Sequence, residues 1–203
     1  MNLADRITLL RIILAPVFFI EYMLLKIFQK ELAGYMVWLI VLLWVIAIVA
    51  ELTDMFDGMA ARHYSLTSDF GKLFDPFADT LVQVTAFFCF VLDGILPAFL
   101  FLVVLYREFG IMLIRNLMLK KGITMGARIS GKVKTVTYII AGAIALLYAS
   151  IIRLSALEFL QPVVKIAYMV RIAAIAVFCL SVLFSVLSFF DYLIVYRKTT
   201  KKN

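Results

Sequence analysis

The chain has 203 residues, of which 65% are hydrophobic and 16% charged, whereas soluble domains average roughly 45–50% apolar and about 25% charged residues. This composition excludes a disordered or fibrous chain, and the length leaves room for one integral membrane domain over residues 1–203. The net charge of +7 favours anionic lipid or a phosphorylated substrate as a partner, and we expect no nucleic-acid partner for so hydrophobic a chain.

Apolar stretches along the chain predict an all-α integral membrane protein with six transmembrane helices. A short interfacial segment at residues 2–6 is expected to precede the first helix. The spans are predicted at residues 7–25, 33–62, 71–92, 96–118, 131–152 and 165–196, because glycine, proline or charged residues separate the apolar stretches. Asp93-Gly94, followed by Pro97, marks the clearest turn.

The distribution of basic residues predicts the orientation of these spans. Six spans place both termini on one side of the membrane. Fifteen of the 20 Lys and Arg residues then fall on the side of the termini and five on the other side. Because basic residues favour the cytoplasmic side, both termini are expected in the cytoplasm.

Two stripes of acidic and small residues lie at the cytoplasmic ends of the second and third predicted helices. The first stripe comprises Asp54, Asp57, Gly58 and Ala61. The second stripe comprises Gly71, Asp75 and Asp79. Spacings of three and four residues put each stripe on one helix face, and a short loop over residues 61–70 would set the two faces against each other.

The four carboxylates of these stripes would repel one another beside lipid unless cations neutralised them. Oxygen ligands without His or Cys favour Mg²⁺ or Mn²⁺, and four carboxylates suit two ions that clamp a phosphate group. Two other interpretations stay open. The acids could be solvated on a helix extension and balanced by Arg62 and Lys72, or they could form the cation site of a transporter, which would favour acids spread through the membrane depth.

The complete pattern is Asp54-x-x-Asp57-Gly58-x-x-Ala61-Arg62, eight residues, then Gly71-x-x-x-Asp75-x-x-x-Asp79. It resembles the signature of the CDP-alcohol phosphotransferase family at every defined position. Outer segments are similar to the family's phosphatidylglycerophosphate synthase branch; they contain Thr8, Arg11, Arg107-Glu108, Arg115 and residues 131–135. The resemblance covers nearly the whole chain. It implies a six-helix, homodimeric enzyme of phospholipid biosynthesis in the cytoplasmic membrane of a bacterium, with its active site facing the cytoplasm.

The resemblance also implies a reaction and the residues that perform it. The hydroxyl of an acceptor would attack the diacylglycerol-linked phosphate of CDP-diacylglycerol, and CMP would leave. Two Mg²⁺ or Mn²⁺ ions would be held by Asp54, Asp57, Asp75 and Asp79, and Asp79 would also be the base for the hydroxyl. The cytidine diphosphate would be lined by Gly58, Ala61, Arg62 and Gly71.

A group of basic residues predicts the acceptor site. They are expected at the cytoplasmic ends of the fourth and fifth helices, and comprise Arg107, Arg115, Arg128, Lys132 and Lys134. Glycerol 3-phosphate is a dianion near neutral pH and would match this charge. The alternative is ordinary basic flanking of membrane spans.

Departures from the branch pattern at Glu51, Met112 and Arg128 leave the acceptor open to inositol phosphate or another head group. A choline or ethanolamine phosphotransferase is a further alternative within the family.

Overall fold

The structure, a computed structural model, describes residues 3–64, 69–120, 122–123, 129–155 and 164–200, with side chains except at 3–4, 54–64, 69–73, 164–165 and 200. The elements are α1 (Leu3–Ile27), the 3₁₀ helix η1 (Ala33–Tyr35), α2 (Met36–Tyr64), α3 (Asp69–Leu92), α4 (Ala98–Lys120), α5 (Ile129–Ser155) and α6 (Val164–Thr200). Within these ranges there is no strand, which confirms the predicted all-α class.

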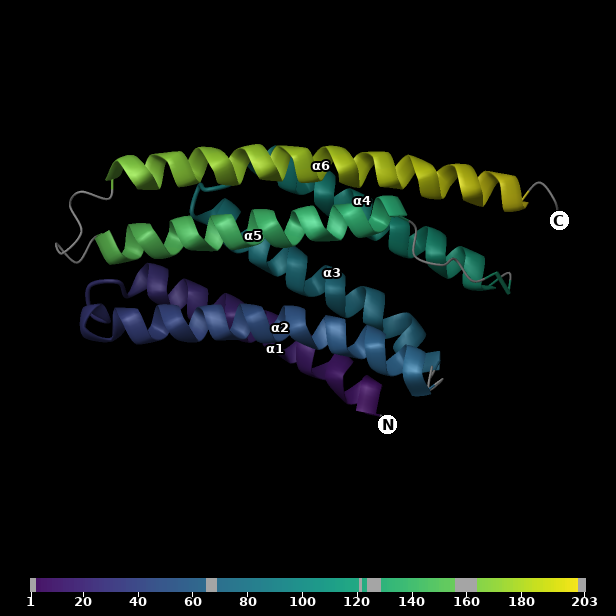
Figure 1. The fold of residues 1–203 in the computed structure, drawn as a ribbon, viewed down its shortest axis with the longest axis horizontal. Helices are drawn as coiled ribbons and strands as arrows, with labels where there is room; N and C mark the ends of the chain where they lie inside the picture. Colours follow the sequence, from purple (N-terminus) through teal and green to yellow (C-terminus); the bar gives the residue numbers. More distant parts are fainter. Residues whose placement is uncertain (1–2, 65–68, 121, 124–128, 156–163, 201–203) are drawn as a thin grey trace.

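The helices form an elongated bundle with the two ends of the chain at the same end of it (Figure 1). α1 packs against α2 and α3, and α5 packs against α6 along much of its length. α3 crosses the middle of the bundle and also contacts α4 and α5 (Figure 1). α3 therefore connects the α1–α2 pair with the α4–α5–α6 group, and residues along it contact both halves.

Five described helical segments are long and apolar enough to cross a membrane, namely Asp5–Ile27, Ala33–Thr53, Phe74–Leu92, Ile129–Ser155 and Ile166–Thr199. Large apolar side chains also point outward, with Trp38 74% and Tyr106 71% exposed, as expected of helices that face lipid. The chain is therefore an integral membrane protein. α4 is not among the five, because Arg107, Glu108 and Arg115 interrupt its apolar sequence.

Several predicted boundaries can be compared with the structure. α1 runs unbroken from Leu3, so residues 3–6 of the interfacial segment expected at 2–6 are part of the first helix, and residue 2 lies outside the described residues. α2 continues to Tyr64, which confirms that its acidic segment is a helical extension of the apolar one. α3 begins at Asp69, two residues before the predicted start, and the connection at 65–68 lies outside the described residues.

The predicted turn at Asp93-Gly94 is confirmed, and a charged cluster fixes this end of the bundle. Gly94 has a φ of +67°, a conformation that suits glycine. Asp93 accepts hydrogen bonds from the Tyr22 hydroxyl at 2.6 Å and from Arg153 Nη2 at 2.9 Å, and it pairs with Lys26 at 3.0 Å. These contacts tie α1 and α5 to the end of α3, at the end opposite the two termini.

An aromatic cluster forms the centre of the bundle. The ring of Phe87 on α3 lies 5.2 Å from that of Tyr138 on α5 and 5.0 Å from that of Phe178 on α6, both edge to face. All three side chains are buried. Because Phe87 is two turns beyond Asp79 on the same helix, this cluster also sets the position of α3 near the predicted site.

Candidate active site

α1 supplies the partners of the two described acidic residues of the predicted metal site. Thr8 donates a hydrogen bond to Asp75, and Arg11 donates one to Asp79. Arg11 Nη2 also lies 3.6 Å from Asp75 Oδ1. The Arg11 side chain is only 2% exposed, whereas those of Asp75 and Asp79 are 41% and 38% exposed. One buried guanidinium therefore offsets only part of the charge of two carboxylates, both of which remain partly exposed.

The backbone places the other predicted donor-site residues on the same pair of helices. Asp54, Asp57, Gly58, Ala61 and Arg62 lie within α2, and Gly71 lies within α3. Their side chains are outside the described part of the chain. Among the described side chains, no three His, Cys, Asp or Glu residues form a group able to hold a metal ion. The four-carboxylate metal site therefore stays a prediction.

Asp75 and Asp79 nevertheless fit the chemistry of the predicted ions. Both are oxygen donors one turn apart on α3, and they share a single cationic partner, Arg11, so a further positive charge at this face would be favourable. Their partial exposure leaves carboxylate oxygens accessible to hard cations such as Mg²⁺ or Mn²⁺.

A polar cavity of about 180 Å³ joins Asp79 to the predicted acceptor site. Its charged and aromatic lining comes from four helices and comprises Asp79, Arg107, Glu108, Arg115, Lys132, Lys134 and Tyr192. Four of the five predicted basic residues thus share one cavity with Asp79. The fifth, Arg128, lies outside the described residues.

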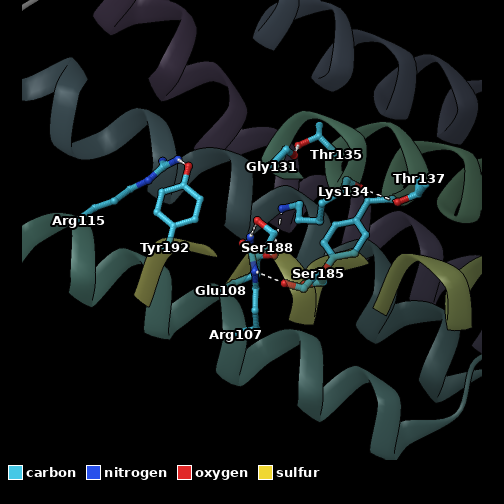
Figure 2. Close-up of polar contacts among 11 residues, drawn as sticks. Arg107, Glu108, Arg115, Gly131, Lys134, Thr135, Thr137, Ser185, Ser188 and Tyr192 are labelled. Atoms are coloured by element: carbon cyan, nitrogen blue, oxygen red, sulfur yellow. Dashed lines mark hydrogen bonds and ion pairs between the residues drawn. The ribbon is translucent and has the colours of Figure 1, made fainter. Parts of the chain in front are cut away.

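Three buried charged residues, Arg107, Glu108 and Lys134, line the polar cavity and form an ion triad. Figure 2 shows their contacts. Glu108 accepts hydrogen bonds from Arg107 Nη1 at 2.9 Å and from Lys134 Nζ at 3.0 Å. Arg107 also donates from Nε to the Ser185 carbonyl at 3.1 Å and from Nη2 to Ser188 Oγ at 2.9 Å. Every guanidinium nitrogen of Arg107 therefore has a partner within the protein.

Arg115 is held differently from Arg107. Its Nη2 donates to the Tyr192 hydroxyl at 3.1 Å, and its guanidinium lies 5.5 Å from the centre of that ring (Figure 2). Its Nε is buried and has no hydrogen-bond partner among the described residues. No described carboxylate forms a salt bridge with Arg115 or with the exposed Lys132, so both retain charge for an anion in the cavity.

An apolar cavity of about 250 Å³ lies beside the polar one, between α1, α2, α3 and α5. Its walls include Phe18, Trp44, Phe87 and Leu146. A smaller pocket between the two cavities contacts Arg11, Ala50, Glu51, Asp79, Val82 and Gln83. Apolar and charged space therefore meet near Asp79.

Sequence reasoning about the site missed several polar residues that the structure brings to it. From the sequence, Glu108 is predicted only as part of a segment similar to the family's, and no site residue is predicted on α6. Ser185 and Ser188 contact Arg107, and Tyr192 contacts Arg115. Ser181, one turn before Ser185, bonds to the Thr137 carbonyl, and all four residues are buried on α6. Their spacings of four, three and four residues form a polar helical stripe inside an otherwise apolar span, and this pattern could have identified them.

Comparisons with known proteins agree with the motif. The family model for CDP-alcohol phosphatidyltransferase matches residues 1–195. A Treponema pallidum protein named CDP-diacylglycerol–glycerol-3-phosphate 3-phosphatidyltransferase is 35% identical over 95% of this chain and 88% of its own length. Proteins with the same name from Bacillus subtilis and Rickettsia felis are 33% and 27% identical over 72% of this chain, and 77% and 75% of their own lengths. The chain belongs to the CDP-alcohol phosphatidyltransferase family.

Proposed function

We propose that this protein transfers the phosphatidyl group of CDP-diacylglycerol to glycerol 3-phosphate, giving phosphatidylglycerophosphate and CMP. The observation that carries the proposal is the polar cavity that Asp79, Arg115 and Lys132 line together. A carboxylate able to accept a proton and basic groups able to bind a phosphate are the two requirements of this acceptor. The names of the relatives agree with this reaction.

The donor would bind where α2 and α3 carry the family motif. Asp54, Asp57, Asp75 and Asp79 would hold two Mg²⁺ or Mn²⁺ ions. These ions would supply positive charge to the phosphate oxygens. Gly58, Ala61, Arg62 and Gly71 would line the cytidine diphosphate, with the guanidinium directed to its phosphates and the small residues allowing close approach. The acyl chains of the donor would enter the apolar cavity, which adjoins Asp79 through the small pocket.

The acceptor would bind in the polar cavity with its phosphate at Arg115 and Lys132. Asp79 would accept the proton of the acceptor hydroxyl as its oxygen bonds to the lipid-linked phosphorus. The bond from that phosphorus to the oxygen shared with CMP would break, and CMP would carry away the bonding electrons.

The triad suggests that its two basic residues have a different task from Arg115. Because Arg107 and Lys134 already share the charge of Glu108, we propose that they shape the cavity and supply one net positive charge to it. Arg115 and Lys132 would make the direct contacts with the phosphate. Arg128, predicted in the same group, would add its charge to this phosphate site.

For the arrangement in the membrane, we propose one domain with six spanning helices, α4 being the sixth. Its charged residues would be tolerated because Arg107 and Glu108 face the protein interior. Both termini and the active site would lie on the cytoplasmic side of a bacterial cytoplasmic membrane, and the protein would be a homodimer.

The test is CMP release by the purified protein in detergent with CDP-diacylglycerol and a panel of acceptors. Glycerol 3-phosphate should support release, whereas glycerol, serine and free inositol should not, because they lack the phosphate. Preference for inositol phosphate would change the acceptor but keep the chemistry. Activity with CDP-choline and diacylglycerol would refute the phosphate-binding role of Arg115, and the absence of any CMP release would favour a cation transporter.

A further inference from the structure

Gln83 occupies the point where the three cavities of this site meet. It lies one turn after Asp79 on α3, about 6 Å further along the helix axis. It lines the polar cavity, the apolar cavity and the small pocket between them. It is the only glutamine that lines any of these three described cavities. A ligand that passed from the polar to the apolar space would therefore contact this side chain.

The side chain of Gln83 is half-buried, and its amide forms no hydrogen bond with another described residue; its polar atoms are not among the fully buried ones, so they remain accessible to a ligand or to water. Its neighbours on the apolar side include Val82, Ala86 and Phe87, which offer nothing to bond with. Gln29, by comparison, donates to the Arg153 carbonyl at 3.4 Å. An amide that lies at a cavity junction and is committed to no partner within the protein is free to bond to a polar group of a ligand there.

The chemistry of that group follows from the two spaces that Gln83 separates. Under the proposed function, the donor's phosphate lies near Asp79 and its acyl chains lie in the apolar cavity. The part of the lipid between them is a glycerol unit whose ester carbonyls accept hydrogen bonds and cannot donate them. The side-chain nitrogen of a glutamine is a donor and matches this part of the lipid.

We propose that Gln83 is a specificity-determining residue that donates a hydrogen bond to an ester carbonyl of the lipid donor. The contact would fix the depth at which the lipid enters the apolar cavity and would thereby hold the phosphorus beside Asp79. This inference rests on the proposed function. It goes beyond it by predicting that the enzyme distinguishes ester-linked from ether-linked donors.

The experiment compares CDP-diacylglycerol with the CDP-dialkylglycerol of the same chain length, whose ether linkages lack the carbonyls. The wild type should show a kcat/KM about 2- to 10-fold higher for the ester donor than for the ether donor, which corresponds to the free energy of one neutral hydrogen bond. Gln83→Met keeps a side chain of similar length without the amide and should bring the ratio close to one. Gln29→Met, at the opposite end of the bundle, is the matched control and should keep the wild-type ratio.

The outcomes separate this inference from the proposed function. If the wild type releases CMP but uses both donors equally, the proposed role of Gln83 is overturned. This result is obtained on the wild type alone, so it does not depend on whether a variant folds. An unchanged ester preference in Gln83→Met also overturns it, as does a variant that raises only the KM for glycerol 3-phosphate. No CMP release from either donor refutes the proposed function itself, and the inference with it.

Discussion

Replacing Glu108 by glutamine tests the buried triad. The substitution keeps the size of the side chain but removes the negative charge that Arg107 and Lys134 share. All three side chains are less than one tenth exposed, at 6%, 6% and 9% for Glu108, Arg107 and Lys134. Two buried cations would then remain without the carboxylate that bridges them. Breaking a buried pair in this way costs about 3–5 kcal/mol, or roughly 100- to 5,000-fold in the unfolding equilibrium.

The remaining contacts indicate which cation suffers most. Arg107 keeps its bonds to the Ser185 carbonyl and to Ser188. Lys134 keeps the face of the Tyr138 ring, 4.4 Å from Nζ, and the longer-range attraction of Asp79, but no hydrogen bond to another described residue. The double variant Glu108→Gln/Lys134→Met should therefore be more stable than Glu108→Gln alone, with a coupling of about 1–3 kcal/mol.

The two cysteines provide the assay for this prediction. Cys89 is buried and Cys179 is exposed. In a Cys179→Ser background, the rate at which a maleimide dye reacts with Cys89 reports unfolding in detergent. Glu31→Gln, at an exposed position before η1, is the matched control. The reasoning is refuted if Glu108→Gln protects Cys89 as well as the wild type does, or if Glu31→Gln exposes it equally.

Three further predictions concern the site and the orientation. Arg115→Ala should raise the KM for glycerol 3-phosphate about 10- to 150-fold, which corresponds to the free energy of one charge-assisted contact, and should barely change the KM for CDP-diacylglycerol. Steady-state kinetics with each substrate varied would measure both constants. An equal rise in both would show that Arg115 does not bind the acceptor's phosphate. Activity should require added Mg²⁺ or Mn²⁺, and Asp75→Asn should abolish it while the thermal unfolding midpoint holds; full activity in excess chelator would contradict a metal site. Thr199→Cys in a background free of Cys89 and Cys179 should resist an impermeant thiol reagent in intact cells, and labelling from outside would reverse the orientation.

The sequence predicted the helical architecture well because apolar stretches and their charged or glycine-rich boundaries follow directly from membrane burial. The turn at Asp93-Gly94 and the extension of α2 to Tyr64 are examples. The sequence could not predict the cluster of Tyr22, Asp93 and Arg153, because these residues are far apart in the chain and meet only through helix packing.

The candidate site, too, could be predicted from the sequence only in part. The spacing of Asp75 and Asp79 identified one face of α3 from the sequence, and charge alone brought Arg107, Arg115 and Lys134 into one group. Charge could not tell which of them are free to meet a ligand. That distinction depends on Glu108 and on the polar stripe of α6, both of which come from contacts across helices.

Identifying the lipid product tests most directly whether the protein transfers the phosphatidyl group to glycerol 3-phosphate. Purified protein in detergent, supplied with CDP-diacylglycerol, glycerol 3-phosphate and Mg²⁺, would be analysed by mass spectrometry for lipids and by chromatography for nucleotides. Phosphatidylglycerophosphate and CMP should form in equal amounts, and neither should form when glycerol 3-phosphate is omitted. Unchanged CDP-diacylglycerol after prolonged incubation, or CMP release with glycerol 3-phosphate left unconsumed, would contradict this transfer.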